Sequence, residues 1–179
     1  MSDEPRGPMQ PLRFDLSEMV RKSVATLYSH LVTRPTGQAL RLGIESQIGE
    51  VGSPCVSILD FRQVVVMDYS CADEAVAKLL RRYVREEAEE VYFFARGVGE
   101  RHIDTIDAVL VRHGLALVVQ FDDDAIALLG PVSARELRVW EVVQAKGRAR
   151  AAEVASDLRS PEADVDATLA RLSRRRVLA

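Results

Sequence analysis

The chain has 179 residues, of which 47% are hydrophobic and 28% charged, so it can bury a core and is not disordered as a whole. No apolar run approaches the ~18 residues that a membrane span needs. The first residues lack the basic start and the apolar core of a signal peptide. The two cysteines, Cys55 and Cys71, match no disulfide framework. We therefore expect a cytoplasmic protein that does not contact membranes.

The charge is divided unevenly along the chain. Residues 131–179 carry 10 Lys/Arg against 7 Asp/Glu, whereas residues 1–130 carry 14 against 20, although the net charge of the whole chain is only −3. Such asymmetry is typical of two units with different partners. Gly130 and Pro131 mark the boundary between them, so we predict one domain over 14–130 and a second over 131–179.

The N-terminal segment allows two interpretations. Residues 1–13 are rich in proline and predict a flexible arm. Residues 14–31 contain apolar positions that fit one helical face, but Phe14-Asp15-Leu16 also fits an edge strand. Residues 34–37, Arg-Pro-Thr-Gly, are expected to break the pattern. A helix should then carry three apolar residues and end near Gly49; these are Leu40, Ile44 and Ile48.

Two short apolar runs follow, and each ends in an acid. The runs end at Asp60 and Asp68, are rich in β-branched residues, and predict buried strands. The period then changes to that of a helix, with Ser70 as the expected N-cap and with Asp73 and Glu74 in the first turn. The apolar stripe of this helix comprises Ala75, Leu79 and Tyr83.

The same alternation continues to the boundary. Residues 91–95 predict a strand, residues 97–99 a loop, and the next apolar stripe a helix that ends at His113-Gly114. Residues 115–121 and 125–129 predict two strands joined by a hairpin turn at three aspartates. The fold class is therefore α/β, with a mixed β-sheet flanked by helices.

Three short helices are expected after the boundary. Ser133 opens the first in a capping box, and Ser160 caps the third, with Pro161 at its first position. Residues 174–178 look like the entry to a strand, so the segment resembles a winged helix-turn-helix without a second wing strand. We expect the apolar pair Val177-Leu178 to pack on the first domain or on a second copy, which predicts a homodimer.

The turn at Asp68 carries a family resemblance. Val66-Met67-Asp68-Tyr69-Ser70 before an amphipathic helix resembles the Met-Asp-Ser-Ser-Gly turn of the STAS domain, the fold of bacterial anti-sigma-factor antagonists. Asp60-Phe61 with residues 69–74 is similar to a divergent STAS-like group. The resemblance covers residues 34–129 and implies a kinase-like ATPase or an anti-sigma-type regulator as the partner. It also implies that Tyr69, directly after Asp68, occupies the position that is phosphorylated in the classical family, with Ser70 as the second hydroxyl.

Each candidate at this turn has a structural alternative. Tyr69 and Ser70 are either a switch or a helix cap beside a packed aromatic ring, and we favour the cap. Asp68, Asp73 and Glu74 have the hard oxygen ligands of a divalent cation site, but a solvated helix start is the preferred interpretation. We therefore expect no metal and no cofactor.

The basic group near the end of the chain also has two interpretations. Its members can contact nucleic-acid phosphates or complement the negative end of a helix. Three acids precede it in the half of the helix that would face DNA, namely Glu162, Asp164 and Asp166. The basic residues are Arg171, Arg174, Arg175 and Arg176.

No catalytic motif is recognisable. The three histidines are far apart and are expected at the surface or at helix ends, and no nucleophile has a base beside it in a known motif. We therefore predict a non-enzymatic regulatory protein that acts by protein–protein interaction in transcription control. The alternative is a transcription regulator that binds DNA through its C-terminal winged helix, with the STAS-like domain as a sensor or dimerisation module.

Overall fold

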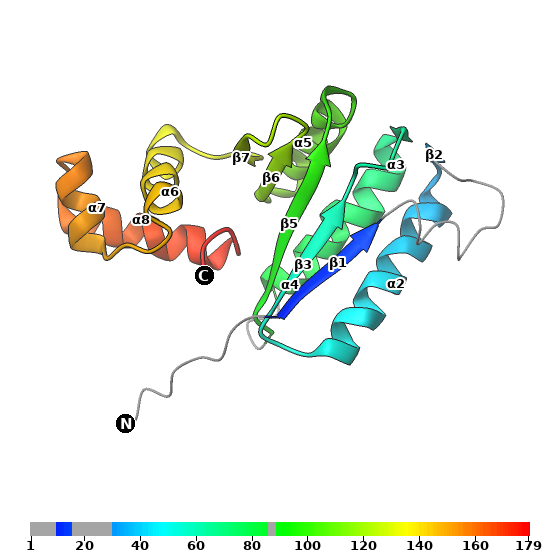
Figure 1. The fold of residues 1–179 in the computed structure, drawn as a ribbon, viewed down its shortest axis with the longest axis horizontal. Helices are drawn as coiled ribbons and strands as arrows, with labels where there is room; N and C mark the ends of the chain where they lie inside the picture. The colour runs from blue at the N-terminus through cyan, green and yellow to red at the C-terminus, as the bar shows by residue number, and fades with distance from the viewer. Residues whose placement is uncertain (1–9, 16–29, 86–88) are drawn as a thin grey trace.

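A five-stranded sheet with helices packed against it forms the larger part of the molecule (Figure 1). The computed structural model describes residues 10–15, 30–85 and 89–179. The strand order is β1-β3-β5-β6-β7; the first four are parallel, and β7 is antiparallel to β6. The predicted mixed sheet is therefore confirmed. The strands are β1 (Gln10–Asp15), β3 (Cys55–Asp60), β5 (Val91–Val98), β6 (Leu117–Phe121) and β7 (Ile126–Leu129).

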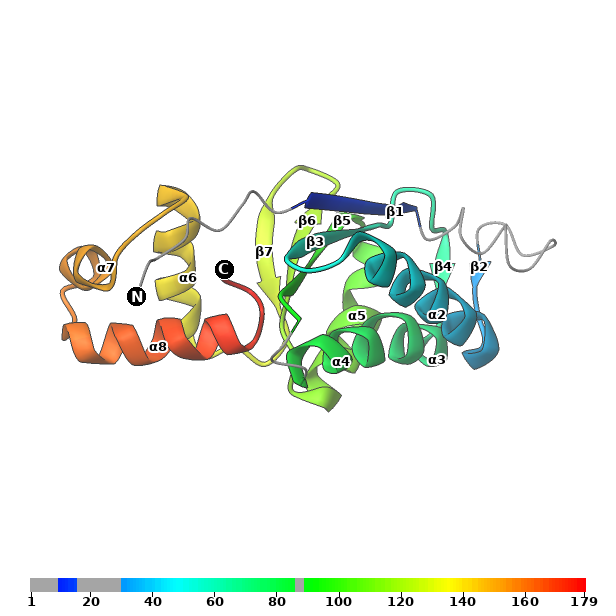
Figure 2. The ribbon, with the colours of Figure 1, turned by 90° about the horizontal axis from the view of Figure 1, so that it is seen from below.

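The helices of this unit lie on one face of the sheet (Figure 2). Successive side chains of a strand point to opposite faces. In β3, Cys55 and Leu59 are fully buried in the core beneath these helices, whereas Val56 and Ile58 alternate with them and are half-buried. The helices are α2 (Arg34–Val51), α3 (Tyr69–Ala72), the π-helical η1 (Asp73–Lys78), α4 (Leu79–Arg85) and α5 (Glu100–His113).

The N-terminal part of the sheet begins earlier than expected. Strand β1 starts at Gln10 and pairs in parallel with β3, so the flexible-arm prediction is wrong for residues 10–13. Of the two interpretations of the next segment, the edge strand is confirmed as far as Asp15, because β1 lies at the edge of the sheet. Residues 1–9 and 16–29 lie outside the described part of the chain.

Helix α2 begins where a break was predicted. Pro35 occupies the first turn, where its missing N–H has no intrahelical partner to lose, so it starts the helix instead of stopping it. The apolar stripe is confirmed, since Leu40, Ile44 and Ile48 are all buried. The helix ends at Val51, two residues beyond the predicted end at Gly49.

The strand predicted in the apolar run before Asp68 is confirmed only over its last two residues, and it lies outside the five-stranded sheet. Only β4 (Val66–Met67) is extended, and it pairs in parallel with β2 (His30–Leu31) in a separate two-stranded sheet. Val64 and Met67 are buried, but Val65 and Val66 are 43% and 42% exposed. The run is a connection that places Asp68 at the start of α3, and its β-branched composition alone did not indicate this.

The second half of the sheet largely follows the sequence. The helix end at Gly114, in the left-handed conformation, and the hairpin between β6 and β7 are both confirmed. The predicted loop at residues 97–99 is wrong for Gly97 and Val98, which continue β5 beyond an irregularity in its pairing with β6.

Three helices follow the sheet, as predicted: α6 (Ala134–Lys146), α7 (Ala151–Leu158) and α8 (Glu162–Arg174). The capping box at Ser133 is confirmed. The cap predicted at Ser160 is wrong, because Pro161 is the N-cap and the Ser160 hydroxyl donates to the carbonyl of Leu158 instead. Gly130 has a φ of 104°, and a Cβ there would overlap the Leu115 carbonyl oxygen, so the junction needs glycine.

The end of the chain forms no strand among the described residues, so the predicted wing is wrong. Instead Val177 is 7% exposed, and the Trp140 indole N–H donates to its carbonyl oxygen at 3.3 Å. Both belong to a second apolar cluster that includes Ala116 and Leu128 of the sheet unit. Val177 therefore packs within its own chain, and the argument for a dimer through this pair does not hold. Among the described helices, none is long and apolar enough to span a membrane.

Candidate functional site

The side chain of Asp68 stabilises the turn between β4 and α3 by hydrogen bonds. Its Oδ1 accepts hydrogen bonds from the Cys71 amide at 2.7 Å and the Ser70 hydroxyl at 2.9 Å, and its Oδ2 accepts from the Thr33 amide at 2.9 Å. Burial acts to raise the pKa of Asp68, but the Thr33 and Cys71 N–H groups outweigh it and hold the pKa below its ordinary value. An ionised carboxylate therefore joins two segments that are 35 residues apart.

The hydroxyl of Ser70 does not cap the helix. Asp68 is the N-cap, and Ser70 lies inside α3 with its hydroxyl donating to that carboxylate, so the predicted cap is wrong by two positions. Asp68 fills the role because aspartate is also among the preferred N-cap residues. The neighbouring thiol of Cys71 is fully buried, and burial raises its pKa to about 12, so it is not a thiolate nucleophile at neutral pH.

Tyr69 projects from the same turn toward solvent. Its side chain is 38% exposed. The Arg112 guanidinium of α5 lies 6.0 Å from the ring centroid and donates to the phenol oxygen at 3.3 Å. Val65 and Val66 are exposed just before it, so this turn gathers three of the eight large exposed hydrophobic side chains of the described chain. The sequence placed Tyr69 beside the candidate turn but gave no sign of its partner in α5.

Asp73 and Glu74 are buried, so the predicted solvated helix start is wrong. They are 5% and 4% exposed. Asp73 Oδ1 lies 2.7 Å from His113 Nε2, and Arg34 Nη1 lies 3.2 Å from Asp73 Oδ2 and 2.8 Å from Glu74 Oε1. Lys78 forms a close ion pair with Glu74. Burial acts to raise the pKa of both acids, but hydrogen bonds from these bases keep the pKa values below normal.

The π-helical segment η1 carries both acids against the start of α2. Isolated π-helical turns are rare in proteins and are frequent at functional sites. At Gly37 of α2, a Cβ would lie 2.7 Å from the Cys71 carbonyl oxygen and 2.9 Å from the Glu74 Cβ, so only glycine permits this approach. The close contact brings Arg34, at the first turn of α2, over the two carboxylates.

The carboxylates of this site are engaged by bases, which leaves little capacity for a cation. In the described residues, no group of three or more His, Cys, Asp or Glu side chains is arranged to hold a metal ion. Asp68 binds backbone amides, and Asp73 and Glu74 bind Arg34, Lys78 and His113. The arrangement therefore provides a turn held by buried hydrogen bonds and ion pairs, with the exposed ring of Tyr69 beside it.

The histidines occupy three different environments. His30 is exposed, as predicted. His113 is the last residue of α5, as predicted, but it is also the hydrogen-bond partner of Asp73. His102 is only 1% exposed and packs on Phe61 with ring centroids 5.6 Å apart, so the surface prediction is wrong for it. Burial lowers the pKa of His102, which favours the neutral ring.

The C-terminal arginines make contacts within the chain. Arg171 and Arg175 each approach Glu136 Oε1 at 3.7 Å, and Arg175 also donates to the Pro131 carbonyl at 3.1 Å. Arg176 donates to the Glu89 carbonyl at 3.0 Å and lies 5.6 Å from the Tyr92 ring centroid. Arg174 is exposed. Three of the four candidate nucleic-acid contacts are therefore engaged in joining parts of the fold.

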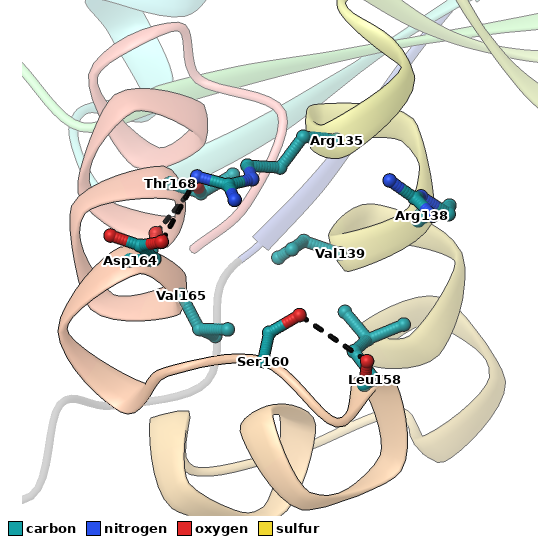
Figure 3. A pocket seen from close by; sticks show the side chains of 8 residues that line it. All are labelled: Arg135, Arg138, Val139, Leu158, Ser160, Asp164, Val165 and Thr168. Carbon is teal, nitrogen blue, oxygen red and sulfur yellow. Dashed lines mark hydrogen bonds and ion pairs between the residues drawn. The ribbon is translucent and has the colours of Figure 1, made fainter.

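A small pocket lies between α6 and the start of α8 (Figure 3). Its volume is about 60 Å³, and Arg135 reaches across it to Asp164 at 3.3 Å. The Thr168 hydroxyl donates to the Asp164 carbonyl at 2.8 Å, so most of the polar lining is already paired. The space suits a few water molecules. Asp164, one of the three acids expected to face DNA, is thus neutralised by an arginine, whereas Glu162 and Asp166 are exposed.

Comparisons with known proteins returned no match to the chain among family models, curated proteins or solved structures. The resemblance to the STAS domain therefore stays a prediction, which rests on Asp60-Phe61 and on the residues of the Asp68 turn.

Proposed function

We propose that the chain is a regulatory protein that binds another protein through the surface around Tyr69. The observation that carries the proposal is the exposure of Val65, Val66 and Tyr69 on a turn that Asp68 holds rigid. Grouped apolar side chains on a soluble surface are typical of interaction sites, and tyrosine is enriched at such interfaces. A preorganised turn also lowers the entropic cost of association.

The class of partner follows from the resemblance to the STAS domain. In this proposal residues 14–130 act as a STAS-like domain and signal in the manner of an anti-sigma-factor antagonist in the cytoplasm. The partner is a kinase-like ATPase or an anti-sigma-type regulator, and the chain itself catalyses no reaction. Homodimerisation remains part of the proposal, although not through Val177.

A capture experiment with matched variants tests the proposal. The double variant Val66→Ser/Tyr69→Ala should lose a partner that the natural chain retains from an extract of its own cells. Leu42→Ser/Val51→Ser is the control, because both residues are exposed and apolar but lie on α2, away from the turn. Equal capture by the two double variants, with equal melting temperatures, would contradict the proposal.

DNA binding through α6 to α8 is the second candidate function. It is favoured by the three-helix order and by the positive balance of residues 131–179, as in a winged helix-turn-helix. Exposed Glu162 and Asp166 weigh against it. A mobility shift with random duplex over a salt series decides between the two, because phosphate contacts impose a steep salt dependence. We expect no shift near physiological salt.

A further inference from the structure

A shallow hollow between α2 and α4 is lined only by basic side chains. Its volume is about 280 Å³. Its residues come from α2, η1 and α4. The hollow is therefore separate from the surface around Tyr69 and from the C-terminal unit, which comprises α6 to α8 and the residues after them. The lining residues are Arg41, Lys78, Arg81, Arg82 and Arg85.

Two carboxylates lie beneath these bases and hold three of them in place. Glu45 pairs with Arg41 at 3.0 Å and with Arg82 at 2.9 Å, while Glu74 pairs closely with Lys78 and lies 3.6 Å from Arg41. The side chains of Glu45 and Glu74 are only 8% and 5% exposed. The acids are therefore covered, and the five bases outnumber the three carboxylates that pair with them, because Asp73 also lies 3.9 Å from Lys78.

Hydrogen-bond donors remain available in the hollow. Arg81 and Arg85 line the hollow and form no ion pair with any residue in the described ranges, and Arg41, which also lines it, has a buried Nε without a hydrogen-bond partner. A buried donor without a partner is costly, and a bound acceptor relieves that cost. Guanidinium groups match the oxygens of phosphate in geometry and charge.

We propose that this hollow binds a compact polyphosphate group, of the kind carried by a nucleoside triphosphate or by free triphosphate. A compact ligand is favoured over an extended polyanion because the hollow, at about 280 Å³, has room for a short group of phosphates and its lining bases all gather in that one place. The site is independent of the protein-binding surface around Tyr69, so either proposal can fail alone.

Calorimetric titration of the full chain with sodium triphosphate tests the site. The double variant Arg81→Gln/Arg85→Gln should bind triphosphate at least about tenfold more weakly, because each charge-assisted hydrogen bond contributes on that order. Neither arginine has a partner in the described chain, so the fold should survive, and a melting curve checks this. Arg101→Gln/Arg148→Gln is the matched control, since both residues are exposed and lie elsewhere.

Titrations with other ligands distinguish the possible sources of the phosphate groups. Adenosine triphosphate that binds as tightly as triphosphate supports the assignment, with the phosphates as the recognised part. Tighter binding to random duplex or to anionic phospholipid vesicles through the same two arginines would overturn the compact ligand. No binding of triphosphate, or equal binding by both double variants, would overturn the site. On the natural chain, a shift of the Arg41 Nε–H resonance on adding triphosphate provides a test that needs no variant.

Discussion

The two arginine-rich regions of the molecule differ in what lies beneath their charges. Near the C-terminus, four arginines are close in sequence, but three of them contact Glu136, Pro131, Glu89 or Tyr92 of the same chain. The hollow between α2 and α4 draws its bases from separate helices, and two of them have no ion-pair partner among the described residues. A run of bases in the sequence therefore does not by itself indicate charge available to a ligand.

The same contrast separates two kinds of buried acid. Glu136 is 8% exposed and serves both the capping box of α6 and the arginines of α8, so it holds the C-terminal unit together. Glu74 is 4% exposed and anchors bases that reach outward. Glu136 therefore stabilises contacts between α6 and α8, whereas Glu74 positions basic side chains at the surface.

The largest expected effect on stability is that of removing the Glu74 carboxylate. Glu74→Ala leaves Arg34, Arg41 and Lys78 without their shared carboxylate, so the free energy of unfolding should fall by about 3 kcal/mol. Urea denaturation measures the loss. Glu141→Ala, at an exposed position of α6, is the control and should change little. A loss for Glu74→Ala no larger than that of the control would mean that the pairs contribute nothing.

A second effect should appear in acid. Asp60 accepts hydrogen bonds from Arg62 and Arg96; burial acts to raise its pKa, but these arginines lower the pKa from 3.8 to about 2. Because the folded pKa is the lower one, the stabilisation is present above about pH 4 and is lost as the pH falls toward 2. The natural chain should lose about 2 kcal/mol more than Asp60→Asn over this range. Parallel stability curves for the two proteins would show that Asp60 does not contribute.

A smaller effect distinguishes two neighbouring arginines. Arg176→Ala removes the hydrogen bond to the Glu89 carbonyl and the contact with Tyr92, and should lower the free energy of unfolding by about 1 kcal/mol. Arg174→Ala, at an exposed position, should stay within about 0.5 kcal/mol of the natural chain. Thermal denaturation of both variants provides the measurement. Equal losses would mean that the basic run acts as a whole.

Local chemistry allowed much of the fold to be predicted from the sequence. Ser133 and Glu136 form a capping box within four residues, and Gly114 ends a helix through its own backbone freedom, so both were identified correctly. The strands at residues 56–60 and 91–95 followed from short apolar runs, rich in β-branched residues in the first and in aromatic residues in the second. The run before Asp68 is also rich in β-branched residues but lies between two turns, and no local feature distinguishes it.

The candidate site could be predicted only in part, because its partners are distant in the sequence. The environment of Asp73 depends on Arg34 and His113, which are 39 and 40 residues away. The Glu74–Lys78 spacing was visible in the sequence, since these residues lie one turn apart on a helix. Burial of both acids, however, required the approach of α2 at Gly37, which no periodicity indicates.

The contact between Trp140 and Val177 gives the protein an intrinsic fluorescence probe of its C-terminal residues. The chain has a single tryptophan, and its indole N–H is bonded to the carbonyl of Val177 in an almost dry environment. Detachment of the last residues would admit water to the ring and shift its fluorescence to longer wavelength. Emission therefore follows the second apolar cluster, in which Trp140 is buried, while circular dichroism follows all helices. A difference between the two unfolding midpoints would measure how strongly the two apolar clusters are coupled.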